Sequence, residues 1–255
     1  NYLDILASGR TNGLNNIRAT SEHFTFNGKK IIDKNEAWFF RTIADQYLMS
    51  DPRDGKTSQR GFPTIPQLHH EDWKPIAGEN AWVMIGALQA AFANAKGQTV
   101  SYDSKEVRLA LSLLDTFEQM QSPTGGIYHA PEGTFEKDPR DISTENNASA
   151  FSAFKILLQI LEQSRAKVTD AQKKRALEVQ IGKTRKILYG DATTKHKGIE
   201  GYFKNYAFER KNGVFYQGGF WLGDRFEPSA DFATDVQTWT VAALGPDWVV
   251  KNVGN

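Results

Sequence analysis

Three acidic residues could do chemistry together because each stands just before an apolar stretch of the chain. They are Glu79, Glu145 and Asp235. An apolar stretch of this kind predicts a buried helix, so each carboxylate is expected at a helix N-terminus. Glycoside hydrolysis uses two carboxyl groups: one donates a proton to the leaving oxygen, and the other activates water or attacks the sugar. We therefore take the three acids as candidate catalytic residues.

The same acids also have a structural interpretation. Acidic and amide side chains near a helix start stabilise backbone N–H groups that lack a partner. The positive end of a helix favours an ionised carboxylate, which suits a base or nucleophile. A proton donor needs an apolar or like-charged setting, which convergence of the acids would supply. The sequence does not say which acid has which role.

Polar and aromatic residues in the same regions are candidates for contacting a substrate. They are Asn80, Tyr128, His129, Asn146, Tyr202, Trp221, Arg225, Asp231 and Trp239. Trp82 and Trp239 fall in the first turns of predicted helices, where core packing is the alternative. Asp231 could equally cap the helix that carries Asp235. Tyr128, His129 and Tyr202 are the bases that a lyase mechanism would use.

Other familiar sites are not indicated. His69 and His70 are followed by Glu71 and Asp72, but adjacent side chains rarely point at one ion, so we expect neither a metal nor a cofactor. No phosphate-binding glycine loop and no Gly-x-Ser-x-Gly motif is present. The chain has no cysteine, which excludes disulfides, thiolate metal sites and a cysteine nucleophile.

Two kinds of helix are predicted to position these residues. Residues 82–92, 150–158 and 239–244 are apolar on most sides and are expected to be buried. Residues 103–121 and 170–189 carry one apolar stripe and are expected at the surface. Two concentric layers follow from this alternation, and parallel inner helices would bring their acidic starts together. A further helix is predicted at 35–49.

Short strands are predicted in the connections between the helices. Residues 24–32 contain Asn27-Gly28 and predict a hairpin. Residues 125–130 predict a short strand after a Gly-Gly turn. Within 190–232, the aromatic and glycine-rich segments 200–203 and 213–222 predict one or two hairpins.

Length and composition are those of one soluble-type folding unit. We expect the 255 residues to form a single domain, with 40% hydrophobic and 12% aromatic residues to build its core. A net charge of +1 does not favour nucleic acid or acidic lipid as a partner. No stretch is apolar enough for a membrane span. The chain begins at Asn1 instead of Met, and we expect an exported protein, secreted or periplasmic.

The stretches GENAW (78–82), STENN (143–147) and TDVQTW (234–239) resemble the inner-helix starts of α/α-toroid proteins, which include six-hairpin glycosidases, polysaccharide lyases and sugar epimerases. The resemblance covers about 78–245. It implies an all-α ring of helical hairpins with small β-hairpins in its loops and a sugar-binding cleft at one end. Six helices are predicted and a complete ring has twice as many, so an incomplete or truncated ring is implied.

These observations together favour a carbohydrate-active enzyme. We expect a glycoside hydrolase acting on a poly- or oligosaccharide, with Glu79, Glu145 and Asp235 sharing the acid, base and nucleophile roles. One alternative is a polysaccharide lyase with a Tyr or His base. The other is a toroid without catalytic activity that binds glycan or acts as a scaffold. The sequence does not indicate an oligomeric state.

Overall fold

Apolar residues at helical spacing give the chain a mostly helical fold. The computed structural model describes residues 76–130 and 140–253, together with four short strands earlier in the chain. Its helices are α3 (Ala77–Ala95), α4 (Lys105–Leu111), α5 (Leu114–Gln119), α6 (Thr144–Lys167), α7 (Ala171–Tyr189), α8 (Ile199–Asn205), α9 (Thr234–Leu244) and α10 (Pro246–Asn252).

The strands are short and antiparallel. They are β1 (Thr25–Phe26), β2 (Lys29–Lys30), β3 (Leu48–Ser50), β4 (Thr57–Gln59), β5 (Asp141–Ser143), β6 (Gly190–Asp191), β7 (His196–Lys197), β8 (Phe208–Glu209), β9 (Val214–Phe215), β10 (Gly218–Trp221) and β11 (Phe226–Pro228). Four pairs form hairpin-like sheets, and β10 lies between β5 and β11. Added Cβ atoms on Gly218 and Gly219 would lie 2.5 and 2.4 Å from carbonyl oxygens of the flanking strands, so β10 requires glycine there.

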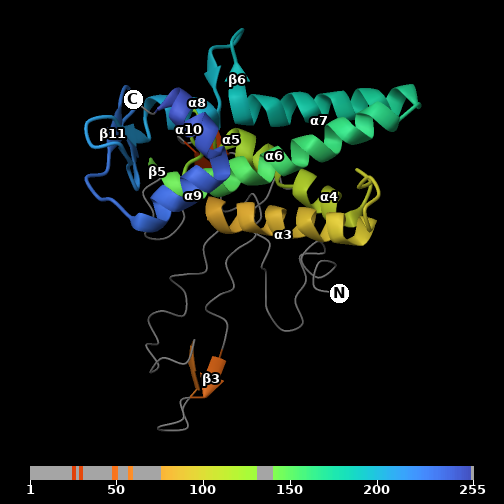
Figure 1. Cartoon of the computed structure of the whole chain (residues 1–255), viewed down its shortest axis with the longest axis horizontal. Helices are drawn as coiled ribbons and strands as arrows, with labels where there is room; N and C mark the ends of the chain where they lie inside the picture. The colour runs from red at the N-terminus through yellow and green to blue at the C-terminus, as the bar shows by residue number, and fades with distance from the viewer. Residues whose placement is uncertain are drawn as a thin grey trace.

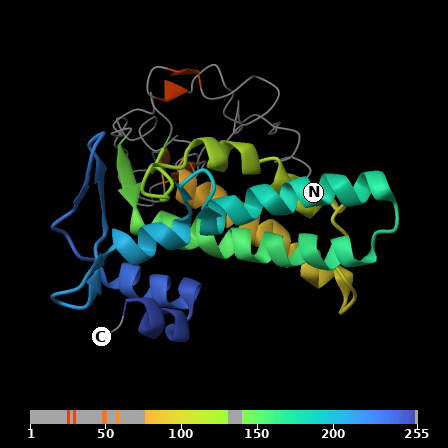
Figure 2. The same ribbon diagram turned by 90° about the horizontal axis from the view of Figure 1, so that it is seen from above.

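Helix α6 is the central element, and its neighbours form two rows. α3 and α9 pack on two sides of it, and α7 packs on another. Figure 1 shows α3, α6 and α9 running in one direction, with their N-termini at the end of the molecule where β5 lies. α7 runs back in the opposite direction, and Figure 2 shows the same arrangement from above. The three helices are therefore parallel, as the convergence of their N-termini requires.

The core is built around α6. Thirteen of its residues are buried, as expected for the stretch 150–158. Phe154 meets Phe117 of α5 edge to face, with ring centroids 5.1 Å apart. Phe151 meets Phe203 of α8 in the same way at 6.2 Å. Such aromatic pairs each contribute about 0.5–1.5 kcal/mol beyond the area they bury.

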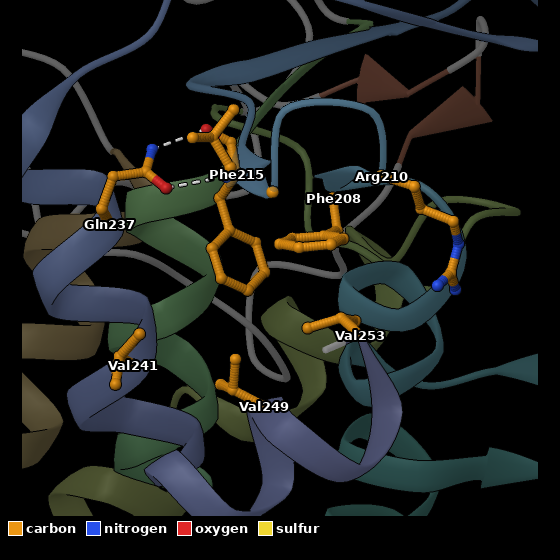
Figure 3. A pocket seen from close by; sticks show the side chains of 9 residues that line it. Phe208, Arg210, Phe215, Gln237, Val241, Val249 and Val253 are labelled. Carbon is orange, nitrogen blue, oxygen red and sulfur yellow. Dashed lines mark hydrogen bonds between the residues drawn. The ribbon is translucent and has the colours of Figure 1, made fainter. Parts of the chain in front are cut away.

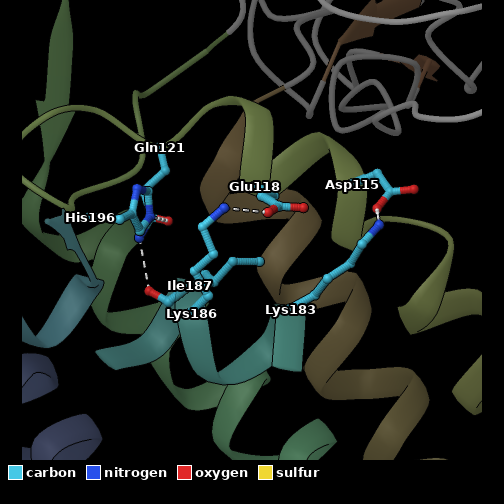
Figure 4. Close-up of polar contacts among 7 residues, drawn as sticks. All are labelled: Asp115, Glu118, Gln121, Lys183, Lys186, Ile187 and His196. Atoms are coloured by element: carbon cyan, nitrogen blue, oxygen red, sulfur yellow. Dashed lines mark hydrogen bonds and ion pairs between the residues drawn. The ribbon is translucent and has the colours of Figure 1, made fainter. Parts of the chain in front are cut away.

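Polar contacts hold α7 against α5 on the outer side (Figure 4). Lys183 pairs with Asp115 at 2.5 Å, and Lys186 pairs with Glu118 at 2.9 Å. Surface pairs of this kind contribute little stability, commonly about 0–1 kcal/mol. Below them, the Gln121 amide nitrogen donates to Ile187 O at 2.8 Å. The outer row is thus aligned by paired charges and by one half-buried side-chain amide, that of Gln121.

Three amide side chains at equivalent positions secure the starts of α3, α6 and α9. Asn80, Asn147 and Gln237 are each the fourth residue of their helix. Each donates from its side-chain nitrogen to the carbonyl just before the helix, at 2.8, 2.8 and 3.3 Å respectively. These bonds satisfy a carbonyl at the turn into the helix, where the backbone has left its strand pattern.

Two of these amides also hold the backbone of a preceding strand segment. Asn147 accepts from Ile127 N at 2.6 Å and donates to Ile127 O at 3.0 Å. Gln237 accepts from Phe215 N and donates to Phe215 O, both at 2.7 Å. Pairing both backbone groups of one residue imitates a strand neighbour. Each segment is thereby joined to the helix that follows it.

Each segment also bonds to the previous helix of the row, through the residue that lies two positions after Ile127 or Phe215. His129 O accepts from Ala77 N, the first residue of α3, at 2.9 Å. Gln217 O accepts from Thr144 N, the first residue of α6, at 2.9 Å. The spacing is the same in both cases, from Ile127 to His129 and from Phe215 to Gln217. A repeated backbone device therefore links neighbouring helix starts, and the sequence reasoning did not find it.

Several predicted elements are confirmed. α7 coincides with the expected helix, and the Asp170 carboxylate accepts from Lys173 N at its start. The hairpin within 24–32 is present as β1 and β2. Hairpins occur within 190–232 as β6–β7, β8–β9 and β10–β11. The helix predicted at 35–49 lies outside the described residues except for Leu48 and Met49, which are in β3.

Three predictions about local structure are wrong. The single helix 103–121 is interrupted between α4 and α5, where the Ser112 hydroxyl donates back to Leu109 O at 2.7 Å. Residues 200–203 lie in α8, because Ile199, Tyr202 and Phe203 have helical spacing and are all buried. Neither α3 nor the stretch 239–244 of α9 is buried on most sides. Trp82 and Phe92 of α3 are exposed by 50% and 38%, and within 239–244 only Thr240 and Leu244 are buried.

The buried amide of α6 should be important for stability. Replacing Asn147 by Ala leaves the buried backbone groups of Ile127 without partners, so we expect the free energy of unfolding to fall by about 2–4 kcal/mol. Asn205 makes the same bond to the fourth preceding carbonyl but is exposed, and Asn205→Ala should cost no more than about 0.5 kcal/mol. Urea denaturation measures both, and equal losses would contradict this account.

Candidate functional site

The starts of α3, α6 and α9 place six residues, five of them with side chains, on one common face. The second residues of the three helices are Gly78, Glu145 and Asp235, and the sixth residues are Trp82, Ser149 and Trp239. Positions two and six are four apart, so on each helix they lie one above the other. We call Glu145, Asp235, Trp82, Ser149 and Trp239 the acid–indole site.

The two acids of this site interact with each other. Burial raises the pKa of Glu145, and the negative charge of Asp235 raises that pKa further. Both causes favour the protonated form of Glu145, since its side chain, although exposed, is partly withdrawn from water, and Asp235 repels its negative charge. A carboxyl group in this setting is suited to hold a proton and donate it.

Two tryptophans form the other half of the site. The rings of Trp82 and Trp239 stack with centroids 5.2 Å apart and an angle of 15° between their planes. The Trp239 indole nitrogen donates to Ser149 Oγ at 2.9 Å. Since α6 carries only a serine at the equivalent position, the two indoles can meet over it. Trp82 is half-exposed and leaves part of a flat ring available to a ligand.

The close approach of α3 and α6 depends on a glycine. A Cβ added to Gly78 would lie 2.2 Å from Asn146 Oδ1. Asn146 therefore packs against α3, and its buried Nδ2 has no hydrogen-bond partner among the described residues. It lies next to Glu145 in sequence and remains a candidate for contact with a substrate.

Glu79 and Asn80 are placed differently from one another. Glu79 is the third residue of α3, whereas Glu145 and Asp235 are second residues of their helices, and all three acids are exposed. The repeated sequence pattern suggested that the three acids are equivalent, and the structure shows that Glu79 is offset by one position. Asn80 is fully buried, and its side chain donates to Ile76 O. That position assigns Asn80 to the helix start and corrects its prediction as a substrate contact.

Tyr128 and His129 lie in the segment that crosses the starts of α3 and α6. The His129 ring nitrogen Nδ1 is 3.4 Å from Asp141 Oδ2, and the ring is largely buried. Tyr128 is 5% exposed, and burial raises its pKa to about 12. A tyrosine with a raised pKa gives up its proton less readily, which makes Tyr128 a poor base.

Tyr202 is a core residue, contrary to its prediction as a cleft residue. It has no exposed surface, and its hydroxyl bonds to Thr144 Oγ1 at 3.0 Å. Burial raises its pKa as well, which is against a role as base. The sequence predicted a strand at 200–203, but the segment is helical, and its helical spacing directs the Tyr202 side chain into the core.

Trp221, Arg225 and Asp231 are not brought to the acids. Trp221 packs partly buried against the core at the end of β10. Arg225 is exposed in the following turn, and its guanidinium lies 3.7 Å from Asp224. The Asp231 carboxylate accepts a long hydrogen bond of 3.4 Å from the Ser229 hydroxyl. Helix α9 begins after Ala233 without a side-chain cap, so Asp231 does not cap it.

Sequence reasoning missed two members of the site and one class of supporting residue. Trp82 was weighed as a stacking residue but core packing was favoured for it, and Ser149 was not considered as a site residue. The fourth-position amides were not recognised either. Aligning the three helix starts residue by residue would have shown both sets, because 77–82, 144–149 and 234–239 have acids, amides and tryptophans at shared offsets.

Neither metal binding nor membrane insertion is indicated in the described part of the chain. Within 76–130 and 140–253, no three acidic or histidine side chains gather as metal ligands. His69 and His70 lie outside these residues. Among the described helices, none combines the length and apolar character needed to cross a bilayer.

Comparison of the chain with protein-family models, with curated proteins and with solved structures gave no match.

The interaction between the two acids can be tested by titration. Asp235→Asn removes the like charge, so the pKa of Glu145 should fall but stay above its ordinary 4.5, because burial is the larger cause. Asp231→Asn should leave it unchanged. Carbon-13 NMR of the side-chain carboxyls measures this value.

The raised pKa also fixes a pH dependence of stability. The folded protein holds the Glu145 proton more tightly than the unfolded chain does, so the free energy of unfolding should fall as pH rises from 4.5 through the folded value. This fall should be smaller in Asp235→Asn. No difference between the two proteins across that range would mean that the acids do not interact.

Proposed function

We propose that the chain is a carbohydrate-active enzyme that hydrolyses glycosidic bonds in a poly- or oligosaccharide. The observation that supports this most is the pairing of Glu145 and Asp235 on one face with the half-exposed Trp82. The reaction needs two carboxyl groups, one of which holds a proton, and the pKa of Glu145 is raised. A flat ring beside the acids suits a sugar. Glu79 is exposed in the first turn of the neighbouring helix and remains a third candidate.

The roles follow from the environments. Glu145 is the proton donor, because its setting raises its pKa and keeps the proton available. Asp235 is the base or nucleophile, since it is exposed at the start of α9 beside Glu145. The negative charge of Asp235 in turn helps to keep Glu145 protonated.

We also propose that the helices are successive hairpins of an α/α ring. Support comes from the order of elements, in which each helix of the α3, α6 and α9 row is followed by an antiparallel or packed partner, α4 and α5, α7, or α10. The repeated backbone device between helix starts fits a repeating unit. In such a ring the acid–indole site would lie at the end where the inner helices begin.

Loss of the acids should abolish hydrolysis without unfolding the protein. We expect Glu145→Gln and Asp235→Asn each to lower kcat/KM on a cleaved polysaccharide by at least about 100-fold. Asp247→Asn is the matched control, because Asp247 is also an exposed acid in a first helical turn, that of α10. Release of reducing ends from a polysaccharide panel measures activity, and circular dichroism checks folding.

The same assay separates the alternatives. New ultraviolet absorbance in the products would indicate a lyase, for which His129 is the remaining base candidate, since burial disfavours Tyr128 and Tyr202. Glycan binding without cleavage would support the binding-module alternative. Full activity in Glu145→Gln and Asp235→Asn would overturn the assignment of these two acids.

Trp82 should affect substrate binding more than the chemical step. Removing its ring by Trp82→Ala is expected to raise KM about three- to tenfold, with kcat little changed, because stacking acts on substrate and transition state alike. Phe92→Ala, an exposed aromatic of the same helix, is the control and should leave KM unaltered. A pure loss of kcat would place Trp82 in the catalytic step instead.

A further inference from the structure

We propose that a second site, between the β8–β9 hairpin and helices α9 and α10, binds a small amphipathic carboxylate whose apolar part lies inside and whose carboxylate pairs with Arg210. The pocket has a volume of about 440 Å³. Figure 3 shows the side chains that line it. Ligand pockets commonly measure about 300–1,000 Å³ and are mostly apolar with a few polar groups.

The interior of this pocket is apolar. Its walls include Phe208 and Phe215 from the hairpin, Val241 from α9, and Val249 and Val253 from α10. Gln237 also lines the pocket, but both polar atoms of its side chain are already bonded to the Phe215 backbone (Figure 3). A ligand inside therefore meets hydrocarbon and aromatic rings, and an alkyl chain or single ring gains from leaving water.

The walls are held in place before any ligand binds. The two hydrogen bonds between Gln237 and Phe215 tie the hairpin to α9. Phe208 and Phe215 pack edge to face with centroids 5.0 Å apart. On the α10 side, Trp248 donates to Glu200 Oε1 of α8 at 2.7 Å. A pre-formed pocket spends little binding free energy on ordering its side chains.

The polar group at the mouth is a guanidinium. Arg210 is exposed in the turn between β8 and β9, and within the described residues no carboxylate pairs with it. The nearest acid in sequence, Glu209, is engaged by the backbone N–H groups of Lys211 and Asn212 at 2.8 Å. Arginine offers two parallel N–H donors to a carboxylate, so an anionic head group on an apolar tail matches both parts of the pocket.

This site is separate from the acid–indole site. Gln237 and Val241 lie four apart on one face of α9, whereas Asp235 and Trp239 lie four apart on another. The proposal therefore does not depend on glycan hydrolysis, and a failure of either leaves the other standing.

Calorimetric titration with three probes tests the proposal. Octanoate carries both the tail and the charge, octan-1-ol has the tail alone, and acetate has the charge alone. On the wild-type protein we expect octanoate to bind more tightly than octan-1-ol, and acetate not to bind. Absence of octanoate binding, or equal binding of octanoate and octan-1-ol, would overturn the proposal.

Two pairs of variants locate the binding. Arg210→Gln should weaken octanoate about two- to fivefold and leave octan-1-ol unchanged, while Arg225→Gln, at another exposed hairpin turn, should change neither. Val249→Phe should fill the pocket and weaken both probes at least about tenfold, while Val250→Phe, next to it but 70% exposed, should not. Unchanged octanoate affinity in Arg210→Gln, which alters only a surface side chain, would overturn the assigned role of the guanidinium.

Discussion

Hydrogen bonding of buried backbone at the helix starts is the constraint on which the remaining structure depends. Short strand segments cross the N-termini of α3, α6 and α9, and their backbone groups need partners inside the protein. Asn147 and Gln237 supply these partners by pairing with both groups of Ile127 and Phe215. The carbonyl two residues on then bonds to the previous helix. Helix starts that share such a device are held in register, so side chains at equal positions meet.

Register explains how distant residues come to form one site. Trp82 and Trp239 are far apart in sequence but both are sixth residues of their helices, and they stack over the serine of α6. Glu145 and Asp235, as second residues, interact one turn above. Gly78 completes the arrangement by allowing Asn146 to pack against α3. A change in helix register of one residue would rotate each of these side chains by about 100° and disperse the set.

Helix α9 has three faces with different neighbours. Val236, Thr240 and Leu244 are buried, Asp235 and Trp239 belong to the acid–indole site, and Gln237 with Val241 lines the pocket beside α10. This division accounts for its weak apolar pattern, since only one of its faces packs in the core. Two candidate sites on one helix are possible because residues four apart share a face while their neighbours point elsewhere.

The sequence by itself determined the helical character, the bounds of α7 and the presence of hairpins in the connecting segments. It also placed Glu145 and Asp235 at helix starts. Apolar spacing, turn residues and position before an apolar helix are local signals, which a single sequence displays. Tertiary structure decided which residues meet. Burial removed Asn80 and Tyr202 from the candidates, and exposure favoured stacking over core packing for Trp82. Helical spacing placed 200–203 in α8 once Tyr202 and Phe203 had a core to enter. Contacts between residues dozens of positions apart depend on packing and register, which a single sequence does not display.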